Sequence, residues 1–170
     1  TFRNAEQLAD AGASLIAGLL QTKPRAVLGL ATGSSPVGIY RQLVERYRRG
    51  WISFRSASTF NLDEYVGLGR EHPNSYYRFM QEQLFGHVDM PADGIRIPDG
   101  QAADLEAEGR RYDSELERAG AIDLQLLGIG ENGHIGFNEP ESALTGGTHV
   151  TELRDSTRKA NARFFASPDD

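Results

Sequence analysis

The chain opens with an amphipathic pattern that is followed by alternating apolar runs and helical repeats. Asn4, with Gln7 three residues later, is typical of a helix start. The apolar stretch Ala11–Leu20 is too short to cross a bilayer, and acidic residues precede it. The pattern therefore predicts a packed helix instead of a membrane span or a leader. Its large apolar residues predicted to share one face are Leu8, Leu15, Ile16 and Leu19.

Strands and helices are predicted to alternate over the rest of the chain. Apolar runs predict strands at Ala26–Ala31, Ser58–Leu62 and Ile122–Leu127. Helical periodicity predicts helices at Pro36–Arg49, Asn74–Phe85, Asp104–Arg118 and Thr157–Phe165. Ser35 is placed to cap the first of these four helices. Its predicted inner face comprises Val37, Tyr40, Leu43, Val44 and Tyr47.

This alternation is typical of an α/β fold with an open, mostly parallel sheet and helices on both faces, as in Rossmann-like proteins. At 170 residues, with no internal repeat or linker, the chain is expected to form a single domain. Ligands of such sheets bind at the carboxyl ends of the strands. Three polar loops leave strands at those ends, so we expect them to form one site.

The first loop, ATGSSP, starts at Ala31 and joins a strand to a helix. The hydroxyls of Thr32, Ser34 and Ser35, the backbone around Gly33 and the positive end of the helix dipole could together bind an anion. The loop lacks the lysine of a P-loop and the GxGxxG pattern. From these residues alone, a plain strand-to-helix turn with a serine cap is the favoured interpretation.

The second loop, NLDEYVGL, places Asp63 and Glu64 side by side at a strand end. Neighbouring side chains on an extended backbone point in opposite directions, so one of the two is expected to enter the site. Two solvated loop carboxylates are the alternative.

The third loop, GIGENGHIGFNEP, combines glycines with groups that can carry protons. His134 and Glu139 lie five residues apart, and we expect the loop to fold back and pair them. A carboxylate beside an imidazole raises the pKa of the imidazole and orients it for proton transfer. A surface turn with an isolated histidine is the alternative.

Composition narrows the classes of function. Hydrophobic residues make up 39% and charged residues 25% of the chain, and the net charge is −6. This balance argues against nucleic acid or an anionic membrane as a partner, although a local site can still bind a small anion. There is no cysteine, which excludes disulfides and thiolate chemistry and is compatible with a cytoplasmic location. The histidines have no metal-binding spacing, so no metal is expected.

Together these segments resemble the glucosamine-6-phosphate deaminase (isomerase) family. The matching stretches are LGLATGSSPVGIYRQL, STFNLDEYVGL with HPNSYYRFM after it, IDLQLLGIGENGHIGFNEP, and TRKANARFF. The resemblance covers nearly the whole chain, in the order of the family. It implies a sugar-phosphate isomerase fold and conversion of glucosamine 6-phosphate and water to fructose 6-phosphate and ammonia, within amino-sugar catabolism and without a cofactor.

The resemblance also implies roles for individual residues. Asp63 would be the base that moves a proton between C2 and C1 of the sugar. His134 would open the sugar ring, with Glu139 and Asn132 beside it. The glycines from Gly128 onwards would let the backbone approach sugar hydroxyls. The residues implied to bind the phosphate are Thr32, Gly33, Ser34, Ser35 and Arg163.

The chain departs from the family pattern in ways that leave alternatives open. Asn132 stands where some members have an aspartate, and GGTHVTEL lacks the basic residues of regulated members. Members also have a strand before the first helix and further segments after NARFF, so the single catalytic domain at 1–170 is expected to lack both. The resemblance leaves open a homo-oligomer. A lactonase resembling 6-phosphogluconolactonases and a non-catalytic sugar-phosphate sensor are the alternative functions.

Overall fold

The computed structural model describes residues 2–130, 132–140, 145–155 and 157–158. Its centre is a parallel sheet with the strand order β3-β2-β1-β4. The strands are β1 (Val27–Leu30), β2 (Ser58–Asn61), β3 (Ile95–Arg96) and β4 (Leu124–Gln125). The helices are α1 (Ala5–Thr22), α2 (Val37–Arg48), α3 (Tyr76–Gln83) and α4 (Leu105–Ala119), with short 3₁₀ helices at Phe85–His87 and Ala92–Gly94.

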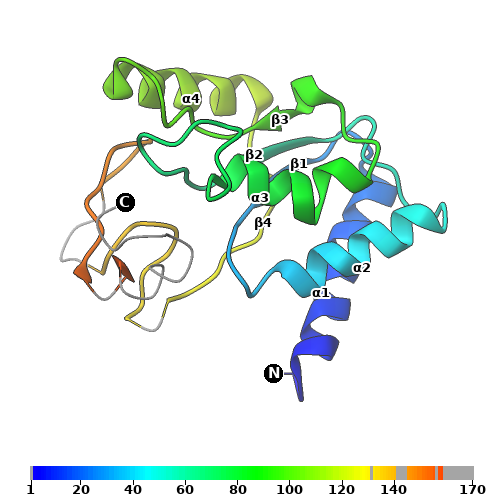
Figure 1. Cartoon of the computed structure of the whole chain (residues 1–170). Coiled ribbons are helices and arrows are strands. Elements are labelled where there is room, and N and C mark those ends of the chain that lie inside the picture. Colours follow the sequence, from blue (N-terminus) through cyan, green and yellow to red (C-terminus); the bar gives the residue numbers. More distant parts are fainter. Residues whose placement is uncertain (1, 131, 141–144, 156, 159–170) are drawn as a thin grey trace.

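Helices cover both faces of the sheet, which confirms the predicted open parallel α/β architecture. On one face Leu28 and Leu30 of β1 pack into a large core with residues of α1, α2 and α3. On the other face Val27 and Phe60 pack against Tyr112 of α4. Figure 1 shows α4 on the opposite side of the strands from α1 and α2. The strands thus have apolar side chains on both faces, as buried parallel strands require.

At one edge of the sheet β4 is shorter than the sequence predicts, and at the other edge β3 was not predicted. The segment Ile122–Leu127 was expected to be a strand, but only β4, Leu124–Gln125, pairs with β1, in register with Leu28 and Gly29. Leu126 still donates its backbone N–H to the carbonyl of Gly29, and the glycine-rich loop begins two residues later, at Gly128. The unpredicted β3 pairs with Thr59 and Phe60 of β2. With only two residues, Ile95 and Arg96, this strand is too short to show a strand periodicity in the sequence.

Helix α1 buries a different face from the one that was expected. Leu8 and Leu15 are 44% and 67% exposed, so their assignment to the packed face was wrong. The buried residues are mostly small: Ala9, Ala13, Ile16, Ala17 and Leu20. An added Cβ on Gly38 of α2 would lie 3.0 Å from the Cβ of Ala9. The two helices approach so closely that small side chains, not leucines, occupy the contact.

Helix starts agree with the sequence at α1 but not at α2. The side chain of Asn4 accepts a hydrogen bond from the backbone N–H of Gln7, as the capping pattern predicted. Ser35 does not cap α2: the cap position is Pro36, and no side chain caps it. Proline presets the backbone angle of a helix start, and the N–H groups of the first turn are left without a side-chain cap.

The remaining helix predictions are confirmed to within a few residues where they can be compared. The predicted helix Asn74–Phe85 is α3 followed by a 3₁₀ helix, and Asp104–Arg118 is α4 with Asp104 as its cap. Of Thr157–Phe165, the structure describes Thr157 and Arg158, both helical; the rest lies outside the described residues. Among the helices of the described part, none has the length and apolar character needed to cross a membrane.

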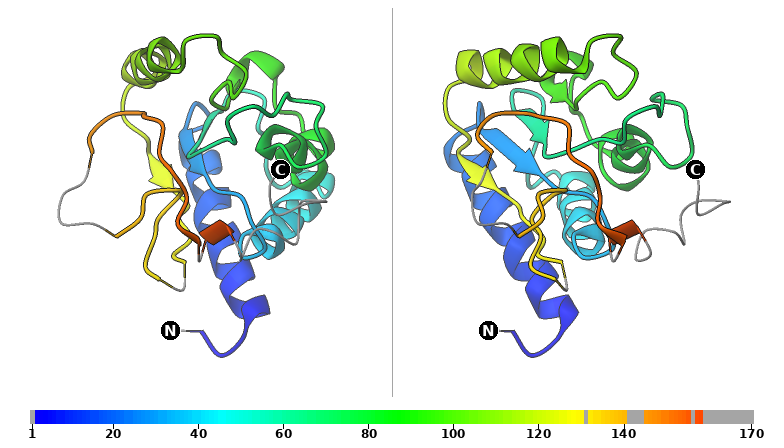
Figure 2. Two further views of the ribbon diagram at one scale, coloured as in Figure 1. Left: turned by 60° about the vertical axis from the view of Figure 1, so that its left-hand side comes forward. Right: turned by 90° about the vertical axis from the view of Figure 1, so that its left-hand side faces the viewer.

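The chain after β4 folds back across the carboxyl edge of the sheet. In both views of Figure 2, residues 145–155 (orange) run from the side of α4 towards the loops that follow β4. Thr148 fastens this segment to α4, because its backbone N–H and its hydroxyl both donate to the Asp113 carboxylate. Thr157, at the other end of the segment, contacts the third polar loop.

Candidate active site

The three polar loops meet at the carboxyl edge of the sheet, as predicted. They enclose an open cavity of about 860 Å³. The wall includes eight of the residues singled out from the loops in the sequence, together with Thr157, which was not. The eight are Thr32, Gly33, Ser34, Ser35, Asp63, Gly128, Asn132 and His134. Segments about a hundred residues apart in the sequence therefore share one cavity.

The turn after β1 forms one end of the cavity and leads into the N-terminus of α2. Gly33 has a φ of 97°, a conformation in which any other residue would be strained. Ser34 and Ser35 are exposed, and Thr32 is half-buried near Tyr76. Backbone N–H groups in the first turn of a helix have no partners within the helix, and the dipole makes this end positive. The turn can accordingly bind an anionic group.

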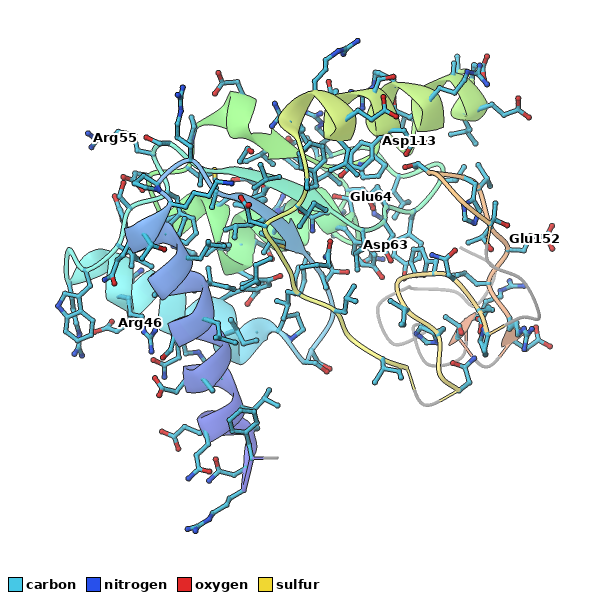
Figure 3. The ribbon with its side chains drawn as sticks, turned by 180° about the vertical axis from the view of Figure 1, so that it is seen from behind. Arg46, Arg55, Asp63, Glu64, Asp113 and Glu152 are labelled. Atoms are coloured by element: carbon cyan, nitrogen blue, oxygen red, sulfur yellow. The ribbon has the colours of Figure 1, made fainter. Side chains whose placement is uncertain are left out.

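Asp63 and Glu64 point in different directions, as expected for neighbours at a strand end (Figure 3). The Glu64 carboxylate turns to α3, where it accepts backbone N–H groups of Tyr76 at 2.9 Å and Tyr77 at 3.0 Å. Glu64 thus stabilises the start of that helix. Asp63 lies in the cavity wall, beside Gly136 of the third loop.

The surroundings of Asp63 suit a general base. Burial of its carboxyl group, with a smaller contribution from the negative charge of Glu64, raises the pKa of Asp63 from 3.8 to about 7. A base works best when its pKa lies near the working pH, because it is then both available and strong enough to take a proton. Asp63 is therefore suited to remove a proton from a carbon acid near neutral pH.

In the third loop the contact between His134 and Glu139 is indirect, which corrects the predicted direct pair. Asn132 lies between them: its Nδ2 donates to Glu139 Oε2 at 2.7 Å, and its Oδ1 lies 2.6 Å from His134 Nδ1. The tight turn at Gly133, with a φ of 91°, brings the asparagine to this position. The residue noted as a departure from the family pattern is thus the link between the other two.

Gly130 explains part of the glycine pattern. A Cβ at this position would lie 2.1 Å from Cε1 of His134, so the imidazole ring rests against the backbone of Gly130. Backbone hydrogen bonds from Gly130 to His134 and from Gly133 to Gly130 close the loop. This glycine makes room for the histidine ring, a role that the sequence reasoning had not assigned. Gly128 lines the cavity, and its contact with sugar hydroxyls stays a prediction.

Arg163, the arginine expected to bind the phosphate, lies outside the described residues, so its contact with an anion stays a prediction. Among the described residues lining the cavity there is no lysine or arginine. In the described part of the chain, no three His, Asp or Glu side chains cluster in a way that could hold a metal ion.

Comparison with known proteins identifies the family. The family model described as "Glucosamine-6-phosphate isomerases/6-phosphogluconolactonase" matches residues 3–164. The chain belongs to this family. It is 53% identical over 167 residues to the glucosamine-6-phosphate deaminase of Geobacillus sp. (strain WCH70). The aligned residues make up 98% of this chain and 66% of that protein. The chain thus spans somewhat less than two thirds of the length of that relative.

Solved structures of the glucosamine-6-phosphate isomerase/6-phosphogluconolactonase family share the fold. A structure described as a monomeric glucosamine-6-phosphate deaminase superposes with a TM-score of 0.96 at 47% identity, covering 99% of this chain and 70% of that one. The 6-phosphogluconolactonase of Thermotoga maritima superposes with a TM-score of 0.67 at 22% identity, covering 79% of this chain and 60% of that one, and supports the fold alone. A homo-oligomer of this chain stays a prediction, since the deaminase neighbour is described as monomeric.

This family member also has cavity residues that the sequence reasoning missed. Tyr65, Tyr76 and Phe137 form an aromatic wall, with ring centroids 4.8 to 5.7 Å apart. The hydroxyl groups of Tyr65 and Tyr76 are 3.2 Å apart. These aromatic residues lie within or beside the sequence motifs, in the stretches YV, SYY and GFN. They were missed because an aromatic residue beside a motif is more often part of a hydrophobic core. Thr157, which also lines the cavity, was likewise missed as a site residue.

Proposed function

We propose that this chain carries the catalytic centre of a glucosamine-6-phosphate deaminase, which converts glucosamine 6-phosphate and water to fructose 6-phosphate and ammonia. The observation that carries the proposal is the position of Asp63. Its carboxylate has a raised pKa and faces a cavity that also contains a histidine and an anion-binding turn. The relative that is 53% identical is named a glucosamine-6-phosphate deaminase, which supports this choice within the family.

Each end of the cavity suits one end of such a substrate. The turn at Thr32–Ser35 would bind the phosphate through backbone N–H groups and hydroxyls, joined by Arg163 as a charged donor. The aromatic wall would lie beside the carbon chain. His134 would exchange a proton with the ring oxygen to open the sugar, while Asn132 and Glu139 hold its ring.

Proton transfer between C2 and C1 would then fall to Asp63. Removal of the C2 proton and its return to C1 converts the amine-bearing carbon into an imine, which water hydrolyses to the ketone and ammonia. The carboxylate takes the proton and returns it, so the protein ends the cycle unchanged. No step in this sequence requires an organic cofactor.

We also propose that the activity is cytoplasmic, because charged sugar phosphates do not cross a membrane unaided.

A lactonase would use the same phosphate turn but needs no base directed at C2. The test is to incubate the full chain separately with glucosamine 6-phosphate, glucosamine and 6-phosphogluconolactone, in the presence of a chelator. We expect equal amounts of ammonia and fructose 6-phosphate from the first, far slower turnover of the unphosphorylated sugar, and no acceleration of lactone hydrolysis. Hydrolysis of the lactone without ammonia release from the amino sugar would favour the lactonase. Calorimetric binding of glucosamine 6-phosphate without any turnover would instead favour the non-catalytic sensor.

A further inference from the structure

Thr157 closes the far end of the hydrogen-bond chain that reaches His134. Its side chain is almost fully buried, at 3% exposure, and its Oγ1 donates to Glu139 Oε1 at 2.5 Å. It arrives from the segment that crosses the sheet edge, eighteen residues after Glu139. The backbone N–H of Arg154 donates to the same Oε1 at 3.4 Å. A distant part of the chain therefore holds one oxygen of this carboxylate, and Asn132 holds the other.

The polarity of these contacts decides which atoms carry protons. An ionised carboxylate can only accept hydrogen bonds, so each group facing Glu139 must donate. The amide of Asn132 must then turn its NH₂ group to Glu139, which leaves its oxygen facing His134 Nδ1 at 2.6 Å. An oxygen at that distance requires a proton on Nδ1. In the neutral imidazole the proton is therefore on Nδ1, and Nε2 carries the lone pair.

The hydroxyl of Thr157 is the main group that favours the ionised carboxylate. Its hydrogen bond, ahead of those from Asn132 and the Arg154 backbone, holds the pKa of Glu139 below its usual range. Were Glu139 protonated, it could donate to Asn132, the amide could reverse, and the imidazole would be offered an NH₂ group in place of an oxygen. The threonine thus acts against a reversal of the whole chain.

We propose that Thr157 is a positioning residue: by holding Glu139 as an acceptor it fixes, through Asn132, the Nδ1–H form of His134 and leaves Nε2 available to exchange a proton with the substrate. The identity of that substrate rests on the proposed function. The state of the imidazole does not, because it follows from contacts within the chain.

The test compares Thr157→Val, which removes the hydroxyl at nearly constant shape, with Thr157→Ser, which keeps it. The protein is labelled with ¹⁵N-histidine, and the ring nitrogens are observed by NMR at an alkaline pH at which the imidazole is neutral. Four histidines contribute signals, and a His134→Gln sample identifies those of His134. Thr148→Val is the matched control: it removes a hydroxyl that also donates to a carboxylate, Asp113 at 2.6 Å on α4 (Figure 3), but it keeps the backbone N–H that holds the segment to Asp113.

We expect Nδ1–H in the unmodified protein, in Thr157→Ser and in Thr148→Val, and a mixture of both forms or mainly Nε2–H in Thr157→Val. Turnover should follow the NMR result: kcat falls about ten- to a hundredfold in Thr157→Val with little change in KM, and Thr157→Ser recovers most of it. Should valine prevent folding, Thr157→Ala allows the same comparison, since it only removes atoms.

Either of two results would overturn the inference. One is an Nε2–H form in the unmodified protein, and the other is an unchanged Nδ1–H form and kcat in Thr157→Val. If the protein has no deaminase activity at all but the NMR results are as expected, the proposed function fails while the role of Thr157 in fixing the imidazole stands.

Discussion

Replacement of Asp63 by asparagine should lower turnover severely and at the same time stabilise the protein at neutral and alkaline pH. The folded protein holds the pKa of Asp63 near 7, against 3.8 for an ordinary aspartate. Between these values the unfolded chain has lost the proton while the folded protein keeps it, so rising pH favours unfolding. A difference of about 3 pH units, at about 1.4 kcal/mol per unit, gives a cost of about 4 kcal/mol above pH 7.

The measurement is urea unfolding of the unmodified protein and of Asp63→Asn at pH 8, 6 and 4. The variant should be more stable at pH 8 by as much as about 4 kcal/mol, by about 3 kcal/mol near pH 6, and by only about 0.5 kcal/mol near pH 4. Its turnover should fall by about 10²- to 10⁴-fold, the usual contribution of a general base. Glu152→Gln, a carboxylate-to-amide change at an exposed site, is the control and should alter stability by less than about 0.5 kcal/mol. Equal stability differences at all three pH values would refute the raised pKa.

Three further substitutions test other parts of the site. Gly130→Ala puts a methyl group where the His134 ring lies, so turnover should fall at least about tenfold. Gly18→Ala is the control, because open space surrounds Gly18 and turnover should not change. Equal turnover in the two variants would show that the His134 ring can shift freely. Arg163→Ala should raise KM for glucosamine 6-phosphate by about ten- to a hundredfold, and an unchanged KM would remove it from phosphate binding. Asn132→Asp adds a negative charge beside the imidazole, which favours the charged form of the ring and should move the acidic limb of the pH–rate profile upward. A pH–rate profile that does not move would show that Asn132 and His134 are not coupled.

Much of the fold and the meeting of the three loops could be predicted, because they depend on local patterns. Alternating strands and helices imply a parallel sheet, and parallel strands end at one edge, so Asp63 and His134 had to lie near each other. The division of work between Asp63 and Glu64 follows from the alternation of side chains along an extended backbone. None of these deductions needs an atomic contact.

What could not be predicted depends on packing between distant segments. Periodicity favoured Leu8 and Leu15 as the buried face of α1, but the close approach to α2 selects alanines. The position of Asn132 between His134 and Glu139 depends on how a glycine-rich loop closes. Thr157 reaches Glu139 across eighteen residues of sequence, a contact between residues with no shared sequence pattern.

The most direct test of the account follows the hydrogen on C2 of the sugar. Glucosamine 6-phosphate deuterated at C2 is incubated with the protein and with Asp63→Asn, and the products are identified by NMR and mass spectrometry. If Asp63 transfers this proton, one fructose 6-phosphate should form for each ammonia released, with the deuterium at C1 or in the solvent, and Asp63→Asn should form both products at least about a hundredfold more slowly. Release of ammonia together with an aldose phosphate that keeps its deuterium on C2 would contradict it, because the proton transfer assigned to Asp63 would then play no part.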